Sequence, residues 1–110
     1  MERKIVAAYP YLDEMGEVLF EAVRQEPKGF ACRRPDGRGG YIWGIEGVRR
    51  VPYHLPEILA AKKAIFITEG EKDADRLISL GVVATCNPCG AGKWRKEFNH
   101  YFSGRPVVVL

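Results

Sequence analysis

A chain of 110 residues with 46% hydrophobic and 28% charged residues fits one folded domain, or one domain with a small appendage, and excludes a disordered protein. Its formal net charge of +3 permits contact with nucleic acid or nucleotides but indicates neither. The charged start at residues 1–4 argues against a secretory signal, and no apolar run is long enough for a bilayer. Three cysteines do not make a disulfide framework, so we expect a cytoplasmic protein without membrane contact.

The first half of the chain has the pattern of antiparallel hairpins. Residues 5–24 form two strand-like runs around a turn at 13–16, and Pro10 restricts the first strand to a sheet edge. Two further runs, 30–34 and 41–45, flank a loop rich in Gly and Pro that can reverse the chain. We therefore expect an antiparallel β-hairpin layer that forms an N-terminal subdomain over residues 1–62.

In the second half, apolar strands alternate with helical segments. In chain order we expect helix 55–61, strand 64–68, helix 71–80 closed by Gly81, strand 82–85, helix 93–102 and strand 106–110. Strands that are almost entirely apolar and alternate with helices indicate parallel pairing, with both faces of the sheet covered. The sequence therefore predicts an α/β protein whose parallel βαβαβ sheet occupies residues 63–110, with a buried strand at its end.

The segment from Ala64 to Arg76 places two carboxylates where such a sheet binds ligands. Glu69 follows an apolar strand, and Asp73 comes four residues later, one helical turn on, so both side chains can face one crevice. Magnesium is commonly held by one or two carboxylates together with substrate phosphates, so the pair suits a metal. The alternative is structural, because residues 68–71 also match a capping box in which Thr68 and Glu71 close the first helical turn.

The loop from Cys86 to Trp94 resembles part of a phosphate-binding loop. A true P-loop is disfavoured because Asn87 stands where its first Gly belongs and Trp94 where its Ser or Thr belongs. Gly90 and Gly92 can still expose backbone N–H groups at a helix start, an anion cradle that Lys93 would reinforce. A tight connection between strand and helix without ligand is an equal alternative.

Cys86 and Cys89 have the spacing of half a zinc site. A structural site needs four ligands, and the remaining candidates, Cys32, His54 and His100, have no second paired spacing. Small buried thiols are the simpler interpretation. A small zinc protein remains a minor alternative function.

Residues 24–50 hold seven basic side chains against three acids, and four aromatic residues lie among or just after them: Phe30, Tyr41, Trp43 and Tyr53. Cations beside exposed rings can hold a single-stranded nucleic acid without sequence preference. The alternative is a small sheet whose aromatic face is core and whose basic face is only solvated. We interpret the aromatic residues as core, and the arginines Arg33, Arg34, Arg49 and Arg50 as candidate nucleic-acid contacts.

Several of these segments together resemble a known family. Residues 66–74, FITEGEKDA, are similar to the first motif of the TOPRIM domain, the α/β module of bacterial-type primases and topoisomerases. Residues 33–37, 41–43 and 87–94 resemble, in the expected order, the primase or primase-helicase proteins of phages and mobile elements. The likeness extends over about residues 9–110 and implies a Rossmann-like TOPRIM core.

The resemblance also implies roles for particular residues. Glu69 matches the family's catalytic Glu, which binds Mg²⁺ or Mn²⁺, and Asp73 matches the acid that often follows it. Contacts with nucleotide or template phosphate are implied for Gly70, Lys72, Gly90, Gly92 and Lys93. The implied partners are a single-stranded DNA template and nucleoside triphosphates, with a replicative helicase as a further candidate in the parent protein.

One part of the family pattern is missing from these residues. The family carries an Asp-x-Asp after its third strand, whereas here strand 106–110 ends the sequence, and the zinc-binding segment that commonly precedes such cores is also absent. Two-metal chemistry needs ligands from both strand ends, so we expect weak metal binding by Glu69 and Asp73 alone. We therefore expect an inactive fragment of a protein that makes RNA primers on single-stranded DNA. The alternative from another class is a non-catalytic single-stranded nucleic-acid-binding module.

Overall fold

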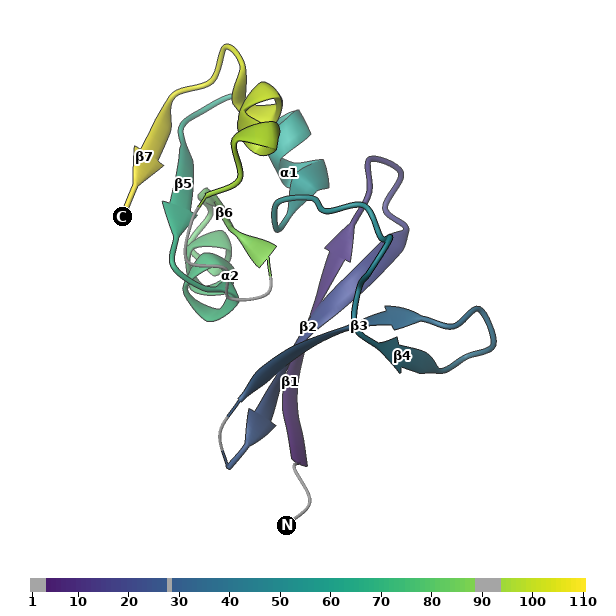
Figure 1. Cartoon of the computed structure of the whole chain (residues 1–110). Coiled ribbons are helices and arrows are strands. Elements are labelled where there is room, and N and C mark those ends of the chain that lie inside the picture. The colour runs from purple at the N-terminus through teal and green to yellow at the C-terminus, as the bar shows by residue number, and fades with distance from the viewer. Residues whose placement is uncertain (1–3, 28, 89–93) are drawn as a thin grey trace.

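A computed structural model of the protein describes residues 4–27, 29–88 and 94–110 (Figure 1). Within these residues an antiparallel sheet in the order β1-β2-β3-β4 precedes a parallel sheet in the order β6-β5-β7. The antiparallel strands are β1 (Lys4–Leu12), β2 (Val18–Glu26), β3 (Phe30–Pro35) and β4 (Tyr41–Trp43). The remaining elements are α1 (Leu55–Ala60), β5 (Ile65–Thr68), α2 (Glu71–Ser79), β6 (Val83–Cys86), the 3₁₀ helix η2 (Lys96–Phe102) and β7 (Val107–Val109). The predicted α/β class and the order of its two layers are confirmed.

An aspartate closes two hairpins of the antiparallel sheet, the one between β1 and β2 and the one between β3 and β4. The Asp13 carboxylate accepts the backbone N–H groups of Met15 at 2.8 Å and Glu17 at 3.0 Å. Asp36 does the same for the N–H groups of Arg38 at 2.6 Å and Gly40 at 3.0 Å. Such Asx-type bonds hold the chain in a turn, which is why these two polar segments reverse it. As predicted, the strand that contains Pro10 lies at the sheet edge.

The parallel sheet places β5 between β6 and β7. Ile67 of β5 is in register with Thr85 of β6 on one side and Val109 of β7 on the other. The helix that follows β5 ends before Gly81, whose φ of 90° is the left-handed conformation that favours glycine after a helix. The carboxyl ends of β5 and β7 therefore lie at the same edge of the sheet, where parallel-sheet ligand sites form.

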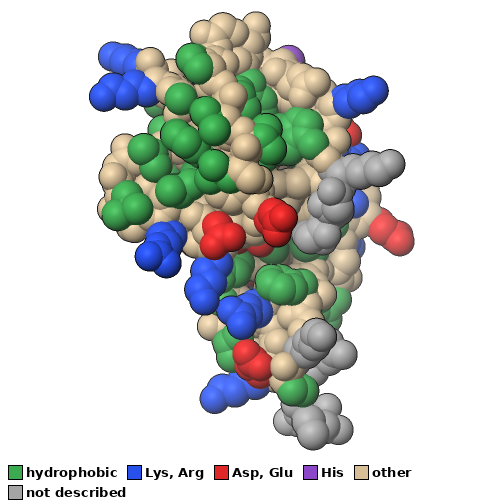
Figure 2. Space-filling model, turned by 90° about the vertical axis from the view of Figure 1, so that its left-hand side faces the viewer, with side chains coloured by type: hydrophobic (Ala, Val, Ile, Leu, Met, Phe, Trp, Pro, Cys, Tyr) green, Lys and Arg blue, Asp and Glu red, His purple; other side chains and the backbone are tan. Residues whose placement is uncertain are grey.

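Two details of the predicted C-terminal half are wrong. Strand 106–110 was expected to be buried, yet β7 is exposed, with 74% of Val109 accessible to solvent. The reason is that β7 is an edge strand, and the described residues include nothing that covers its outer side. Figure 2 shows hydrophobic side chains gathered on the face of the molecule that carries β7 in Figure 1. The expected helix 93–102 is a 3₁₀ helix over 96–102, and Lys93 lies outside the described residues.

One hydrophobic core spans both halves of the chain. Tyr11 of β1 and Phe20 of β2 are fully buried, and their rings stack with centroids 4.6 Å apart. They belong to the same cluster as Ile58 of α1, Ile65 of β5 and Phe98 of η2. The antiparallel layer is therefore packed against the parallel layer, and the boundary at residue 62 separates two sheets that share a core.

Among residues 4–27, 29–88 and 94–110, no helix has the length and apolar character needed to cross a bilayer. The α2 helix has 9 residues, whereas a helix that spans the hydrocarbon core needs about 20.

Candidate functional site

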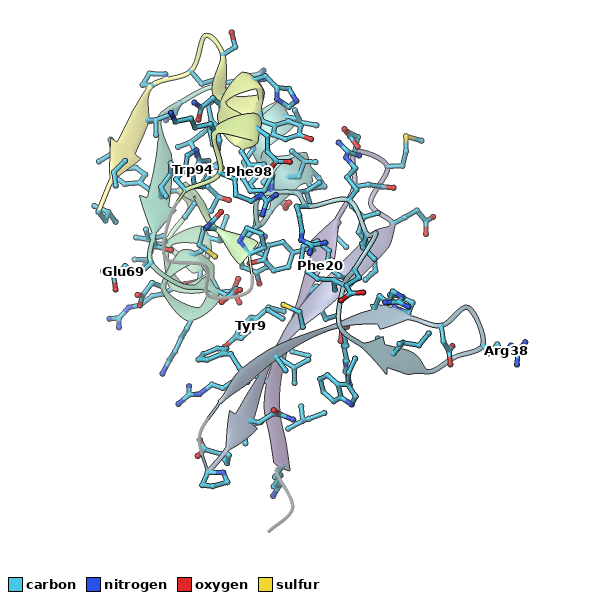
Figure 3. The ribbon with its side chains drawn as sticks, in the orientation of Figure 1. Tyr9, Phe20, Arg38, Glu69, Trp94 and Phe98 are labelled. Carbon is cyan, nitrogen blue, oxygen red and sulfur yellow. The ribbon has the colours of Figure 1, made fainter. Side chains whose placement is uncertain are left out.

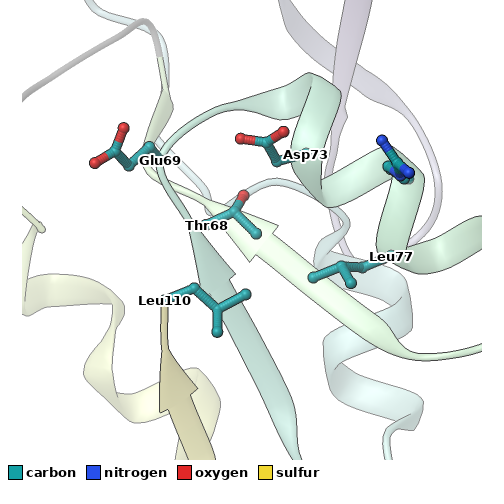
Figure 4. Close-up of a pocket in the computed structure, with 6 residues that line it drawn as sticks. Thr68, Glu69, Asp73, Leu77 and Leu110 are labelled. Atoms are coloured by element: carbon teal, nitrogen blue, oxygen red, sulfur yellow. The ribbon is translucent and has the colours of Figure 1, made fainter.

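A pocket opens at the carboxyl ends of β5 and β7 (Figure 4). Its volume is about 330 Å³, and its polar lining comes from Thr68, Glu69, Asp73 and Arg76. Leu77 of α2 and Leu110, just after β7, supply the apolar side. The structure therefore brings Glu69 and Asp73 to one crevice, at the sheet edge that the sequence predicted.

Local structure explains how the two carboxylates reach this crevice. Glu69 is the first residue after β5, and Asp73 lies in the first turn of α2. In Figure 4 the Asp73 side chain extends from α2 toward the turn that carries Glu69. Both side chains are exposed, and neither forms an ion pair within the described residues. They are therefore free to bind a cation from solution.

The capping-box interpretation of this turn is wrong. The N-cap of α2 is Gly70, and no side chain caps the helix there. The Thr68 hydroxyl donates to the backbone oxygens of Gly70 at 2.8 Å and Thr85 at 3.3 Å, and no N–H group of α2 bonds to it in the described residues. Thr68 instead ties the turn to β6, because Thr85 belongs to that strand. A capping box therefore does not account for the acidic residues of this turn.

Glu71, two residues after Glu69, points the other way. It is only 5% exposed, and its Oε2 accepts a 2.6 Å hydrogen bond from the Tyr11 hydroxyl. The same hydroxyl lies 3.6 Å from the Cys86 sulfur. A signal existed in the sequence, because Glu71 precedes the apolar Ala74 by three residues and so shares its inward helix face.

Burial shifts the acidity of the groups around Glu71. Loss of water is the main reason that the pKa of the Cys86 thiol rises to about 12, and the negative charge of Glu71 raises it further. Burial is likewise the main reason that the pKa of Tyr11 lies far above its ordinary range, and electrostatic interactions with Cys86 and Glu71 raise this pKa further. Tyr11 therefore stays protonated and remains a hydrogen-bond donor to the carboxylate.

A second polar cluster joins α1 to α2 and was not predicted from the sequence. Oδ1 of Asp75 accepts the Tyr53 hydroxyl at 2.8 Å and lies 2.8 Å from Nε2 of His54. His54 precedes α1 with a left-handed φ of 61°, which turns its ring toward α2. Burial, and then the bond to Asp75, raise the pKa of Tyr53. No motif links positions 53, 54 and 75, so only the fold brings them together.

The four candidate arginines each form hydrogen bonds or ion pairs with other residues of the protein. Arg33 forms a 2.8 Å ion pair with Glu21, and its guanidinium lies 3.7 Å from the centroid of the Tyr41 ring. Arg49 binds both carboxylate oxygens of Glu14, at 2.6 and 2.7 Å, and donates to the Tyr101 hydroxyl at 2.6 Å. Arg50 donates to the backbone oxygens of Ile45 and Val48, and Arg34 donates to the backbone oxygen of Gly44. These bonds position each guanidinium, and contact with nucleic acid stays a prediction.

The expectation that the aromatic residues of this region are core is correct for one and wrong for three. Tyr53 is 3% exposed and belongs to the core. Phe30, Tyr41 and Trp43 are exposed by 61%, 46% and 53%. The reason is that β3 and β4 form a twisted arm that projects beyond the packed half of β2, as Figure 1 shows. Figure 3 shows Arg38 at the tip of this arm, far from Glu69.

The remaining predicted site residues divide between the start of α2 and the glycine-rich loop. Gly70 and Lys72 lie at the start of α2, and Lys72 is exposed. Gly90, Gly92 and Lys93, with Cys89, fall outside the described residues. Cys86 is fully buried, and the described residues hold no group of three or more His, Cys, Asp or Glu side chains that could bind a metal.

No protein-family model, no curated protein and no solved structure matches this chain. The structure itself establishes the mixed α/β arrangement, with its four-stranded antiparallel and three-stranded parallel sheets. The TOPRIM core and the primase activity remain predictions that rest on the motif residues.

Proposed function

We propose that this chain forms part of a TOPRIM-type primase core in which Glu69 and Asp73 hold a divalent cation that binds nucleotide phosphates. The observation that most supports the proposal is the shared pocket of these two carboxylates at the carboxyl end of the central parallel strand. Parallel α/β sheets bind ligands at this edge, because the loops that leave the strands converge there. Neither acid forms an ion pair within the described residues, so both carboxylates are available as ligands.

The donor set fits a hard cation of the Mg²⁺ or Mn²⁺ type. Both side chains offer carboxylate oxygens, which these ions prefer, and one or two carboxylates plus phosphate oxygens are a common ligand set. Two carboxylates leave most coordination positions to water or substrate, so we expect weak binding in the absence of a nucleotide. Bound there, the cation would neutralise phosphate charge and stabilise the charge that develops during nucleotidyl transfer.

The protein's own residues supply orientation, charge and partial exclusion of water. Thr68 fixes the turn through its bonds to Gly70 and Thr85, and so fixes the direction of Glu69. Arg76 lines the same pocket and offers a guanidinium for a phosphate. Leu77 and Leu110 make one side of the pocket apolar, which keeps water from that side of a bound group.

The site is tested on the chain as it stands by Mn²⁺ titration, with free ion followed by electron paramagnetic resonance. Replacement of either acid, Glu69→Gln or Asp73→Asn, is expected to weaken binding at least several-fold, because each removes a charged ligand. Glu46→Gln, which changes an exposed acid on the other half of the molecule, is the matched control and leaves binding unchanged. Equal Mn²⁺ binding by all four proteins would remove Glu69 and Asp73 from the metal site.

The activity requires a protein that contains these residues together with the family's second acidic motif. Primer synthesis on single-stranded DNA with nucleoside triphosphates and Mg²⁺ is expected to be lost in Glu69→Gln and kept in Glu46→Gln. If Glu69→Gln binds less Mn²⁺ but makes primers at the parental rate, the pocket binds metal without serving primer synthesis. Retained activity would then direct the search to another catalytic centre.

A second candidate function is supported by the exposed aromatic side chains of β3 and β4. Tyr41 and Trp43 stand on the same face of β4, two residues apart, beside the guanidinium of Arg33. Stacking of bases on such rings contributes about 1–3 kcal/mol per base. In titrations of a labelled oligonucleotide, Trp43→Ala should therefore weaken binding about 5- to 150-fold. Met15→Ala, at an exposed turn residue outside the arm, is the control.

A further inference from the structure

A second pocket lies at the amino ends of β5 and β7, the opposite end of the parallel sheet from Glu69. Its volume is about 430 Å³, and its lining includes Lys62, Lys63, Ser103, Gly104 and Arg105. Figure 1 shows why these residues meet: the segment before β5 and the segment before β7 run side by side at one end of the sheet. Since β5 has four residues, the two pockets are separated by roughly 13 Å of strand.

Arg105 is fixed in this pocket without a carboxylate. Its guanidinium donates to the backbone oxygens of Leu59 at 3.0 Å, Tyr101 at 3.1 Å and Ser103 at 3.4 Å. Its buried Nε atom has no hydrogen-bond partner within the described residues. Neutral carbonyl groups hold the side chain in place but do not neutralise it, so a full positive charge stays at the pocket.

Lys62 and Lys63 add two further positive charges. Both side chains are exposed, and neither forms an ion pair within the part of the chain that the structure describes. The ends of α1 and η2 lie nearby, and cations are favoured at helix C-termini for structural reasons alone. Each helix end carries at most about half a negative charge, however, so two ends offset only about one of the three positive charges.

We propose that the pocket defined by Lys62, Lys63 and Arg105 binds a phosphate group. The ligand is either a phosphodiester of a single-stranded nucleic acid or the phosphate of a free nucleotide, because both present the same oxyanion. The Ser103 hydroxyl and the Gly104 backbone N–H are further donors in the lining, and a Cβ at Gly104 would meet open space, so the approach is unobstructed. This site does not depend on Glu69 or on the proposed metal.

The first test follows backbone amide resonances while inorganic phosphate replaces chloride at constant ionic strength. The pocket segments, residues 61–64 and 103–105, are expected to show saturating shifts. The phosphate affinity obtained from these shifts should fall at least several-fold in the double variant Lys62→Gln/Lys63→Gln. Its changed side chains are exposed and so should not disturb folding. The control Lys4→Gln/Lys96→Gln removes the same charge from exposed positions elsewhere and keeps the parental response. Shifts that are absent, or equal in both double variants, would overturn the proposal.

The second test separates the two sources of phosphate. A labelled single-stranded oligonucleotide is titrated over a range of salt concentrations, and a nucleoside triphosphate without metal is titrated in parallel. If the phosphodiester is the ligand, loss of two phosphate contacts should reduce the slope of log K against log salt by about 1.4 in Lys62→Gln/Lys63→Gln. If the double variant loses affinity for the triphosphate but not for the oligonucleotide, the ligand of the pocket is a free nucleotide. An unchanged affinity for both ligands would overturn the proposal.

Discussion

The Tyr11 hydroxyl donates a 2.6 Å hydrogen bond to the buried carboxylate of Glu71. Tyr11 lies on the edge strand of the antiparallel sheet, and Glu71 begins the helix that follows the central parallel strand. The bond therefore joins the antiparallel sheet to α2, two residues after Glu69 in the chain. A change in the packing between the layers would act on the candidate site through this contact.

Replacement of Tyr11 by Phe should destabilise the fold, because it leaves a buried carboxylate without this donor. We expect Tyr11→Phe to lower the free energy of unfolding by about 1–3 kcal/mol, measured by urea denaturation. Tyr9→Phe is the matched control, since the Tyr9 hydroxyl has no hydrogen bond among the described residues, and it should change stability by less than about 0.5 kcal/mol. Equal losses in the two variants would show that the Tyr11–Glu71 bond contributes little.

The ion pair between Glu14 and Arg49 predicts a pH dependence in acid. The hydrogen bonds from Arg49, and then a backbone N–H, lower the pKa of Glu14 from 4.5 to about 2 in the folded protein. A carboxylate with a lowered pKa stabilises the fold above pH 4.5 and loses that contribution as the pH falls toward 2. The pair is exposed, so its contribution should be below about 1 kcal/mol.

This pH dependence is measured as the difference in unfolding free energy between the parent protein and Glu14→Gln. The difference should be constant above pH 5 and should shrink between about pH 4.5 and 2. Glu46→Gln, at an acid without an ion pair in the described chain, serves as the reference. A difference for Glu14→Gln that does not vary over this range would argue against the pair.

The Cys86 thiol should resist modification while the protein is folded. It is fully buried, and because burial raises its pKa to about 12, almost no thiolate is present at pH 8. We expect labelling of Cys86 by a maleimide at pH 8 to be far slower in buffer than in urea, measured by peptide mass spectrometry. Similar rates in the two conditions would place this thiol at the surface.

Truncation of two phenylalanines ten residues apart should have very different effects on stability. Phe20 is fully buried and stacked on Tyr11, so Phe20→Ala should cost about 3–5 kcal/mol of stability. Phe30 is 61% exposed, so Phe30→Ala should change stability by less than about 0.5 kcal/mol. Thermal unfolding of both variants makes the comparison. A large loss for Phe30→Ala would mean that the β3–β4 arm packs against another part of the protein.

The strand and helix pattern was predictable because local signals agree with the fold. Periodicity 2 and turn residues mark the hairpins, and apolar runs alternating with helical spacing mark the parallel sheet. The juxtaposition of Glu69 and Asp73 followed from their four-residue spacing after a central strand. These are properties of neighbouring residues, which a sequence displays directly.

What could not be predicted depends on contacts distant in the sequence. Basic residues next to aromatic ones suggested a ligand surface, yet Arg33 and Arg49 are paired with Glu21 and Glu14, 12 and 35 residues away. The exposure of Trp43 depends on how far β4 projects beyond the core, which no local pattern encodes. The spacing of Glu71 to Ala74 indicates an inward side chain, but its partner Tyr11 lies 60 residues away in the sequence.

Because Glu69 and Glu71 face opposite directions, the two acids are subject to different selection. At position 71 a replacement acts first on the amount of folded protein, since it alters a contact inside the molecule. At position 69 the chain can vary without that penalty, so any intolerance measured there must come from what the outward carboxylate does. A saturation screen that scores abundance and activity separately would tell these two pressures apart.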